Sequence, residues 1–345
     1  MKEDKNNIVL EFIKNNPNCS SATIFEKLNV PLGLATIKRI LIKNIELEYV
    51  EVVGKGKNTR YRISDYFQFL YPINVADYFK KEIDERNIIG TFNFNVFELF
   101  KNNTVFNKEE LDRLYDLQNK FTENTKHLTP LEYQTELERL AIDLSWKSSQ
   151  IEGNTYSLLE TERLLKDRET ASGKTKEEAV MLLNHKVAID FIVANPDYLE
   201  TLTVAKLEGI HSMLIKDLGV DKNIRKRRVG ITGTNYRPLD NEFQIREALE
   251  LMCEIINKEN NVFVKSLYSL VFLSYIQAFN DGNKRTARIV SNAILISKKH
   301  CPISFRTFDT IEYKKAMLVF YEQNNIHPFK NIFLDQFDFA VNNYF

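Results

Sequence analysis

Apolar residues recur at spacings of three and four along most of the chain, which is the pattern of amphipathic helices packed around a core. From about residue 66 onward nearly every apolar segment has this spacing. The exception is RRVGITGTNYRPLD, residues 227–240, where Val229 and Ile231 alternate with other residues before Gly233 and Pro238. Alternation followed by turn residues is typical of a β-hairpin. The pattern therefore predicts a mostly α protein with a hairpin inside its helical part.

The first 65 residues have a different order of elements. Apolar spacing predicts three short helices, with Ser20 or Ser21 capping the second and the sequence NVPLG, residues 29–33, separating it from the third. Two short stretches, EYVEVV and TRYRI, flank the turn sequence GKGKN and predict a pair of strands. Three helices followed by a hairpin resemble a winged helix-turn-helix, so we expect a small α+β domain over residues 1–65.

Composition agrees with a folded protein of more than one domain. The chain has 345 residues, 43% hydrophobic and 27% charged, which is typical of globular proteins and not of disordered ones. Its three cysteines, Cys19, Cys253 and Cys301, lie far apart and indicate neither a disulfide framework nor a zinc site. The N-terminal sequence MKEDKNN is polar, and the apolar runs are too short to span a bilayer. We therefore expect a cytoplasmic protein that does not enter a membrane.

Basic residues are slightly enriched at the N-terminus. Residues 1–66 contain eleven Lys or Arg and eight Asp or Glu, whereas the whole chain has 47 of each kind. The predicted third helix and wing present cations that would contact DNA phosphates and groove edges. These candidate DNA contacts are Lys38, Arg39, Lys43, Lys55 and Lys57. Because the charge surplus is modest, DNA binding and a protein-interaction role for this domain both stay open.

The sequence QAFNDGNKRTAR, residues 277–288, joins two predicted helices and concentrates polar groups. Gly282 turns the chain directly before a helix N-terminus, whose free N–H groups and partial positive charge favour an anion. Arg285 and Arg288 lie on one face of the new helix, where both can bind one phosphate group, and Lys284 adds a third cation. The loop therefore predicts a phosphate site.

An acid among these cations needs its own explanation. Asp281 is explained if a divalent ion such as Mg²⁺ lies between its carboxylate and the phosphate oxygens. The predicted ligand is a nucleoside polyphosphate with Mg²⁺. The spacing of a P-loop is missing from the chain.

The same twelve residues resemble the signature of the Fic family, H-x-F-x-[DE]-G-N-x-R-x-x-R, and match every fixed position except the first. Fic proteins with this motif are typically adenylyltransferases, which transfer AMP from ATP to a Ser, Thr or Tyr hydroxyl of a target protein. The resemblance implies a mostly α Fic fold over residues 131–345, preceded by a helical connecting region at residues 66–130. It also implies ATP as substrate and Mg²⁺ as cofactor.

The resemblance further assigns roles within the loop. Asp281 would hold Mg²⁺, and the nucleotide phosphates would be bound by Gly282, Asn283, Lys284, Arg285 and Arg288. At Gln277 the family has the histidine that takes the proton from the incoming hydroxyl. A glutamine amide is not basic near neutral pH, and general-base catalysis contributes roughly 10²- to 10⁴-fold. We therefore expect impaired transfer.

A second motif, SSQIEG, lies upstream. It places Ser148 and Glu152 one turn apart on a predicted helix that stops at Gly153. The motif resembles the inhibitory sequence [ST]-x-x-x-E-[GN] of some Fic proteins, in which the glutamate pairs with the second signature arginine, here Arg288, and blocks placement of the γ phosphate. The alternative is an ordinary solvated carboxylate at a helix end, and the position upstream of the signature favours the inhibitory role.

The hairpin predicted at residues 227–240 resembles the flap of Fic proteins, whose edge aligns a target segment by main-chain pairing. The residues expected to contact the target are Val229, Gly230, Ile231, Thr232 and Gly233. A purely structural hairpin is the alternative. His185 and His211 lie on amphipathic helices and are expected to be packing residues.

Three functions are compatible with these motifs. The first is AMP transfer, restrained by Glu152 and impaired by Gln277. The second is an inactive ATP-binding regulator that acts through residues 1–65 on DNA or a protein partner. The third uses the same fold to remove AMP or to transfer another phosphate-containing group. A homo-oligomer is compatible with all three.

Overall fold

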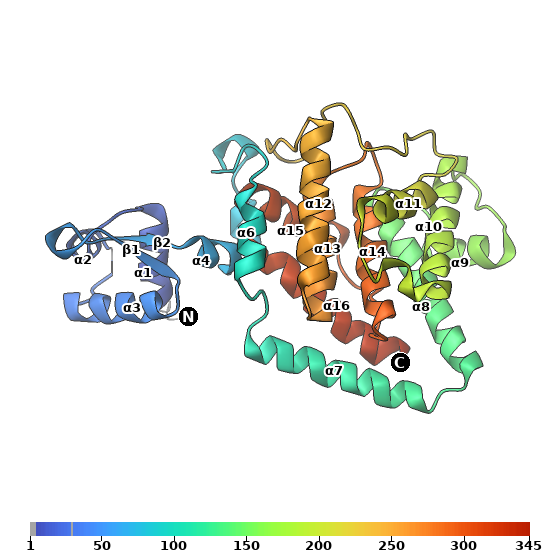
Figure 1. Ribbon diagram of the computed structural model, residues 1–345, viewed down its shortest axis with the longest axis horizontal. Helices are drawn as coiled ribbons and strands as arrows, with labels where there is room; N and C mark the ends of the chain where they lie inside the picture. Colours follow the sequence, from blue (N-terminus) through green and yellow to red (C-terminus); the bar gives the residue numbers. More distant parts are fainter. Residues whose placement is uncertain (1–4, 29) are drawn as a thin grey trace. The chain divides into compact units, whose positions relative to one another are not determined.

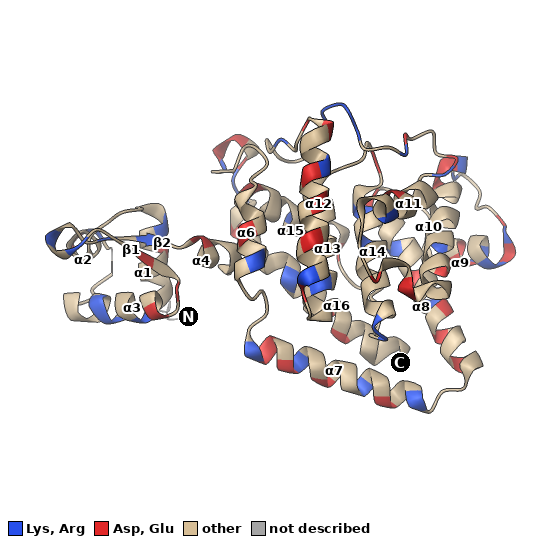
Figure 2. Cartoon of the chain, in the orientation of Figure 1, with Lys and Arg blue, Asp and Glu red and all other residues tan. Residues whose placement is uncertain are grey.

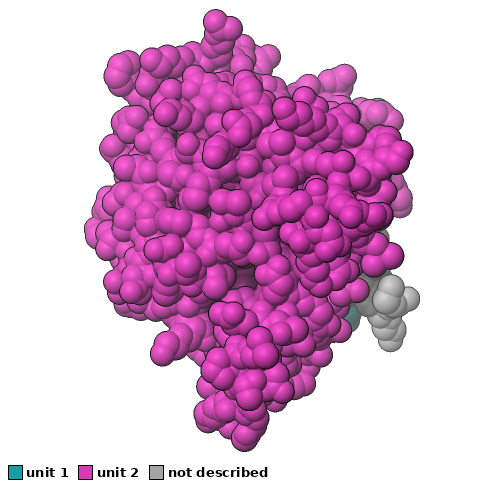
Figure 3. Space-filling view, turned by 90° about the vertical axis from the view of Figure 1, so that its right-hand side faces the viewer, with its two compact units in different colours: residues 1–72 teal, residues 73–345 magenta. Residues whose placement is uncertain are grey.

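The computed structural model describes residues 5–28 and 30–345 (Figure 1). The polar N-terminal segment and the turn predicted at residues 29–33 each include positions outside the described residues. The chain forms two units, residues 1–72 and residues 73–345, which Figure 3 shows in different colours. Within the described residues no helix is long and apolar enough to cross a bilayer.

The N-terminal unit contains three helices followed by two paired strands. Its elements are α1 (Lys5–Asn15), α2 (Ser21–Lys27), α3 (Leu34–Glu46), β1 (Val50–Val53), the 3₁₀ turn η1 (Gly56–Asn58), β2 (Arg60–Ile63) and α4 (Asp65–Leu70). The strands are antiparallel, with Val50 opposite Ile63. Ser20 caps α2 by accepting a hydrogen bond from the amide of Thr23. A winged helix-turn-helix has this order of elements, and that identification stays a prediction.

The second unit is built from helices. They are α5 (Val75–Tyr78), η2 (Ile83–Glu85), α6 (Asn95–Asn102), α7 (Lys108–Lys126), α8 (Pro130–Ile151), α9 (Leu158–Asp167), α10 (Lys176–Ala194), η3 (Pro196–Leu199), α11 (Val204–Leu214), α12 (Glu242–Lys258), α13 (Val262–Ile276), α14 (Asn283–Ser297), α15 (Thr310–Gln323) and α16 (His327–Tyr344). Among the described residues the two-stranded sheet β1–β2 is the chain's one sheet. The prediction of a mostly α fold with a small α+β part is confirmed.

The core of this unit is the pair α13 and α14, which pack along each other (Figure 1). Helix α13 has the sequence VFVKSLYSLVFLSYI and is apolar on all sides, so it is buried almost throughout. Ser266 on α13 and Ser291 on α14 are hydrogen-bonded with 2.7 Å between their hydroxyl oxygens. This close packing fixes the two helices, and therefore also the short loop that joins them.

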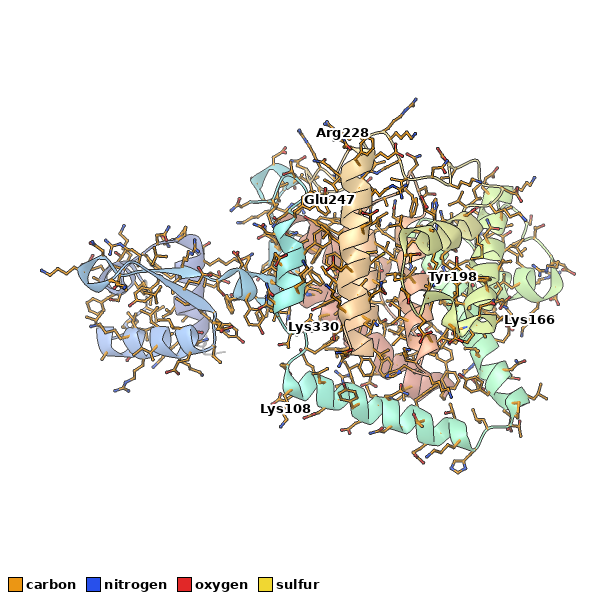
Figure 4. The ribbon with its side chains drawn as sticks, viewed as in Figure 1. Lys108, Lys166, Tyr198, Arg228, Glu247 and Lys330 are labelled. Carbon is orange, nitrogen blue, oxygen red and sulfur yellow. The ribbon has the colours of Figure 1, made fainter. Side chains whose placement is uncertain are left out.

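Helix α7 lies at the edge of the unit and carries acidic and basic residues along its length (Figure 2). It is attached to α16 by an ion pair between Lys330 Nζ and Glu110 Oε1, 2.7 Å apart. Lys330 is labelled in Figure 4 and its side chain is only 6% exposed, so the pair is largely shielded from water.

The hairpin predicted at residues 227–240 is wrong as a secondary structure, because this segment contains no strand. The physical reason is Arg225, which is buried between the two arms of the loop. Its guanidinium donates hydrogen bonds to the carbonyl oxygens of Arg227 and Leu239, one on each arm. These two carbonyls therefore accept hydrogen bonds from a side chain and not from a paired strand, and the segment is a loop around the Arg225 side chain.

Candidate functional site

The loop between α13 and α14 requires two left-handed backbone positions. Gln277 ends α13 at φ 52° and ψ 53°, and Gly282 caps α14 at φ 80°. A Cβ atom at Gly282 would lie 3.2 Å from Cγ2 of Ile215 and 3.3 Å from Cδ2 of His211. Glycine is therefore required there by both conformation and space. Asn283 closes the loop, since its side chain accepts from the Phe279 amide at 2.8 Å and donates to the Phe279 carbonyl at 2.8 Å.

His211 of α11 packs against this loop. Its ring stacks on Phe279 with 3.7 Å between centroids and 5° between planes. Its Nε2 lies 2.9 Å from the carbonyl oxygen of Asp281, and its Nδ1 lies 3.3 Å from that of Lys222. Burial lowers the pKa of His211, while the two carbonyl oxygens act in the opposite direction. The histidine expected to be a packing residue therefore also positions the backbone of the anion loop.

Arg285 has hydrogen-bonding capacity to spare at the start of α14. Its NH2 donates to Asp281 Oδ2 at 2.9 Å, while Asp281 Oδ1 accepts from the Gly282 amide at 2.6 Å. The residue is 1% exposed, yet its Nε and NH1 have no hydrogen-bond partner among the described residues. Unsatisfied buried donors on a cation are costly and are expected where an anion binds.

Arg288 is fully buried, and its Nε and NH2 bind residues of α8 and its C-cap, while its NH1 has no hydrogen-bond partner among the described residues. Its Nε donates to Ser148 Oγ at 2.8 Å and its NH2 to the Ser148 carbonyl at 3.0 Å. The same NH2 forms an ion pair with Glu152 Oε1 at 2.7 Å, and Lys284 Nζ lies 3.7 Å from Glu152 Oε2. Burial alone would raise the pKa of Glu152, but Arg288 and Lys284 hold it below the ordinary value. Glu152, with its side chain 18% exposed, is an ionised, bound group and not a solvated helix end.

A second histidine extends this network into the core. His185 Nε2 lies 2.7 Å from Ser148 Oγ, and the ring is buried. Burial keeps the pKa of His185 well below its ordinary value, with a further lowering by Arg288. Because Arg288 Nε donates to Ser148 Oγ, the hydroxyl proton is available for the neutral His185 ring. The two arginines thus differ in degree, since Arg288 lacks a hydrogen-bond partner only at NH1, whereas Arg285 lacks one at both Nε and NH1.

Glu152, Gln277 and Lys284 line one cavity of about 410 Å³, a volume typical of ligand sites. Its other lining residues are Ile151, Gly230, Ile231, Thr232, Tyr313, Lys314, Met317, Leu318 and Tyr321. Three of the five predicted target-contact residues are in the lining, while Val229 and Gly233 are not. Gly153 follows Glu152 at φ 102° and ends α8, as its motif predicts.

The Gln277 side chain is fixed on this cavity's wall. Its Nε2 donates to the Ser274 carbonyl at 2.6 Å and to the Tyr321 hydroxyl at 3.0 Å. Its Oε1 accepts from Asn283 Nδ2 at 3.3 Å. Both amide protons are therefore committed to the protein, and the group offers only a weakly accepting carbonyl oxygen.

The described residues contain no cluster of three or more His, Cys, Asp or Glu that could hold a metal by themselves. Asp281 has a half-exposed carboxylate, 56% accessible, beside the unsatisfied donors of Arg285. Mg²⁺ is usually held by one or two carboxylates together with substrate phosphates, so this single acid fits such an ion. The five candidate DNA contacts are all exposed in the N-terminal unit.

The fold and the loop define a helical protein with a glycine turn between two buried helices, beside two buried arginines. Residues 201–295 match the model of the Fic/DOC family. A segment of the second unit is therefore similar to the Fic/DOC family.

Curated relatives resemble it over part of their length. The chain is 23% identical over 198 residues to the protein adenylyltransferase Fic of Drosophila willistoni, covering 55% of this chain and 39% of that protein. It is 25% identical over 175 residues to the protein adenylyltransferase Fic of Nematostella vectensis, covering 49% and 40%. The chain thus spans less than half the length of these relatives.

Solved structures share the fold. Fic-1 of Caenorhabditis elegans superposes with a TM-score of 0.59 at 21% identity, covering 69% of this chain and 71% of that one. A Fic domain containing signaling protein from Bacteroides thetaiotaomicron has a TM-score of 0.59 at 18% identity, covering 67% and 95%.

Proposed function

We propose that this chain is a Fic-type protein adenylyltransferase that binds Mg²⁺ and ATP at residues 277–288, is inhibited by Glu152 and is impaired in transfer by Gln277. The observation that carries the proposal is the contrast between two buried arginines on α14. Arg285 pairs with the half-exposed Asp281 and has Nε and NH1 unpaired, whereas Arg288 pairs with the mostly buried Glu152 and has only NH1 unpaired. Glu152, the ion-pair partner of Arg288, lines the same cavity as Gln277 and Lys284.

The nucleotide phosphates bind at the N-terminus of α14, where backbone N–H groups and the helix dipole favour negative charge. Arg285 contributes its free Nε and NH1, and Lys284 lies at the cavity wall. Mg²⁺, held by Asp281 and phosphate oxygens, would neutralise part of the triphosphate charge. ATP as the nucleotide follows from the names of the curated relatives, which are protein adenylyltransferases.

In the transfer, a hydroxyl oxygen of the target attacks the α phosphorus of ATP. A new phosphorus–oxygen bond forms, the bond to the bridging oxygen breaks, and pyrophosphate leaves. The hydroxyl must also lose its proton, and Gln277 has no basic atom to take it. Solvent or a phosphate oxygen has to accept the proton instead, which makes the step slow.

Glu152 restrains the site by competing with the nucleotide for Arg288. The Glu152 carboxylate already lies 2.7 Å from the Arg288 guanidinium. A terminal phosphate that bound the same guanidinium would lie close to this carboxylate, and the two anions would repel each other. Productive binding therefore requires Glu152 to leave, and the cavity must be open to a target at Gly230–Thr232.

A second candidate, an inactive ATP-binding regulator, is favoured by the hydrogen bonds of Gln277. Its side-chain amide is hydrogen-bonded to Ser274, Tyr321 and Asn283. Gln277 can therefore stabilise the conformation of the loop without a catalytic role. Such a regulator would act through residues 1–65 on DNA or a protein partner. If it binds DNA, duplex affinity falls with added salt and falls further in Lys38→Ala and Arg39→Ala; an unchanged affinity in both variants argues for a protein partner.

The test is to incubate the purified chain with Mg²⁺ and α-labelled ATP, and to measure ATP binding separately by calorimetry. We expect binding with little self-labelling, and a gain of label in Gln277→His combined with Glu152→Gly. Gln277→Ala with Glu152→Gly is the matched control, since it releases inhibition without adding a base. Binding without any gain in the histidine variant would support the regulator, and absent binding would overturn both candidates.

A further inference from the structure

A segment before the predicted Fic domain is attached to the loop at residues 227–240. Asn235 Nδ2 donates to Asp84 Oδ1 at 2.8 Å, and the Arg237 amide donates to the Gly90 carbonyl at 3.0 Å. Thr91 and Arg237 form an isolated parallel bridge. The loop therefore packs against residues 84–91, which lie outside both residues 131–345 and the family match at 201–295.

Arg86 is the buried centre of this attachment. Its NH2 donates to the Gly233 carbonyl at 2.8 Å, and its NH1 lies 3.4 Å from Glu322 Oε1. The side chains of Arg86 and Glu322 are 2% and 0% exposed. Tyr78 OH donates to the other oxygen of Glu322 at 2.6 Å. One guanidinium thus connects the loop to the last turn of α15.

Both ends of this connection are walls of the cavity. Helix α15 contributes Met317, Leu318 and Tyr321, and the loop contributes Gly230–Thr232 directly before Gly233. Gly233 has φ 90°, and a Cβ atom there would lie 3.3 Å from Cδ1 of Leu318. The loop therefore approaches α15 closely at the residue whose carbonyl Arg86 binds.

We propose that Arg86 is a positioning residue that fixes Gly230–Thr232 over the cavity and so sets how a target segment presents its hydroxyl. The inference rests on the proposed function of this loop in target binding. Arg86 contacts none of the loop residues 277–288 among its hydrogen bonds and ion pairs in the described chain, so its effect falls on the target and not on the nucleotide.

The test compares Arg86→Lys with Arg228→Lys in the full chain. Lysine keeps a positive charge near Glu322 but lacks the fork that reaches Gly233 as well. Arg228 is the matched control, because it lies on the same loop, projects outward in Figure 4 and forms an exposed ion pair with Asp240. Amide hydrogen exchange of residues 229–236 and calorimetric ATP affinity are measured for both variants.

We expect exchange at residues 229–236 to rise by about tenfold in Arg86→Lys and to stay unchanged in Arg228→Lys, with ATP affinity unaltered. In the background of Gln277→His and Glu152→Gly, self-labelling by Arg86→Lys slows with the ATP dependence preserved. Unchanged exchange at residues 229–236 in Arg86→Lys overturns the inference. A loss of ATP affinity in Arg86→Lys that is as large as the rise in exchange also overturns it. Asp84→Ala, an exposed position, gives the same readout at Asn235 if Arg86→Lys does not fold.

The exchange measurement does not depend on activity. If no variant is labelled, the proposed transfer fails while loosening of the loop in Arg86→Lys still supports the positioning role. If labelling appears but the loop does not loosen, the proposed function stands and Arg86 has no such role.

Discussion

Glu152 and Arg288 are 136 residues apart in the sequence, and their side chains form an ion pair of 2.7 Å inside the second unit. The carboxylate belongs to the residue that caps the C-terminus of α8, where the helix dipole is unfavourable to a negative charge. The arginine compensates for that position, and it is fully buried. The pair therefore couples the end of α8 to the helix that follows the anion loop.

Removing the carboxylate is expected to strengthen nucleotide binding. In Glu152→Gln the Arg288 guanidinium loses its competing anion, so ATP affinity rises by about tenfold, equivalent to about 1.4 kcal/mol. Calorimetric titration with Mg²⁺ and ATP measures the change. Glu136→Gln is the control, since Glu136 lies on the same helix in an exposed ion pair with Arg139. Equal affinity in the two variants contradicts a competing role for Glu152.

Arg285 is expected to lower the thermal stability of the nucleotide-free chain and to raise its ATP affinity. Its Nε and NH1 are buried without partners, so Arg285→Met removes an unsatisfied cation and leaves Asp281 half exposed to water. Thermal stability without nucleotide stays the same or rises, whereas ATP affinity falls by about a hundredfold, since each charge-assisted hydrogen bond contributes about 1.5–3 kcal/mol. Thermal shift with and without ATP measures both effects. If ATP stabilises Arg285→Met as much as it stabilises the parent chain, Arg285 does not belong to the phosphate site.

Substitution of Gly282 is expected to destabilise the fold more than substitution of another glycine with a similar backbone conformation. At Gly219, φ is 68° and a Cβ would meet nothing within 4 Å, so Gly219→Ala costs only the left-handed strain of about 1–2 kcal/mol. At Gly282 the same strain is added to contacts with Ile215 and His211. Gly282→Ala therefore unfolds at a lower denaturant concentration than Gly219→Ala and loses ATP binding. Equal destabilisation would mean that the loop adjusts to the extra methyl group.

The conformation of the loop at residues 277–288 is predictable from sequence because its determinants are local. Asn283 closes on Phe279 and Gly282 turns before α14, all within a few residues. The contacts of Asp281 with His211 and of Ser148 with His185 are different, because they join residues that are distant in the sequence. Helical periodicity indicates only that such a histidine faces the core, and it does not reveal which polar group it meets there.

The hairpin predicted at residues 227–240 is wrong for a related reason. Alternating Val229 and Ile231 followed by Gly233 form a valid hairpin pattern, but strand pairing also needs free main-chain groups on both arms. Arg225 occupies two of those carbonyls, and Arg86 a third. Side chains from other parts of the chain thus replaced strand pairing, which a local pattern cannot anticipate.

The His185 network is expected to make stability fall in mild acid. The folded-state pKa of His185 lies well below its ordinary value of 6.5, because burial and Arg288 disfavour the imidazolium. Below pH 6.5 His185 binds a proton in the unfolded chain but stays neutral in the folded chain. The unfolding free energy therefore decreases as pH falls, by up to about 1.4 kcal/mol per pH unit for this residue. Above pH 6.5 both states are neutral and the contribution is flat.

His185→Gln isolates this effect, because an amide nitrogen or oxygen can still meet Ser148 Oγ but does not titrate. Denaturant unfolding between pH 7 and pH 5 should show a smaller loss of stability in the variant than in the parent chain, with the difference growing steadily below pH 6.5. His127→Gln is the control, since that side chain is exposed at the C-terminus of α7. Parallel pH profiles for the parent and His185→Gln would show that His185 becomes protonated in the fold, and the neutral Ser148–His185 contact would then be wrong.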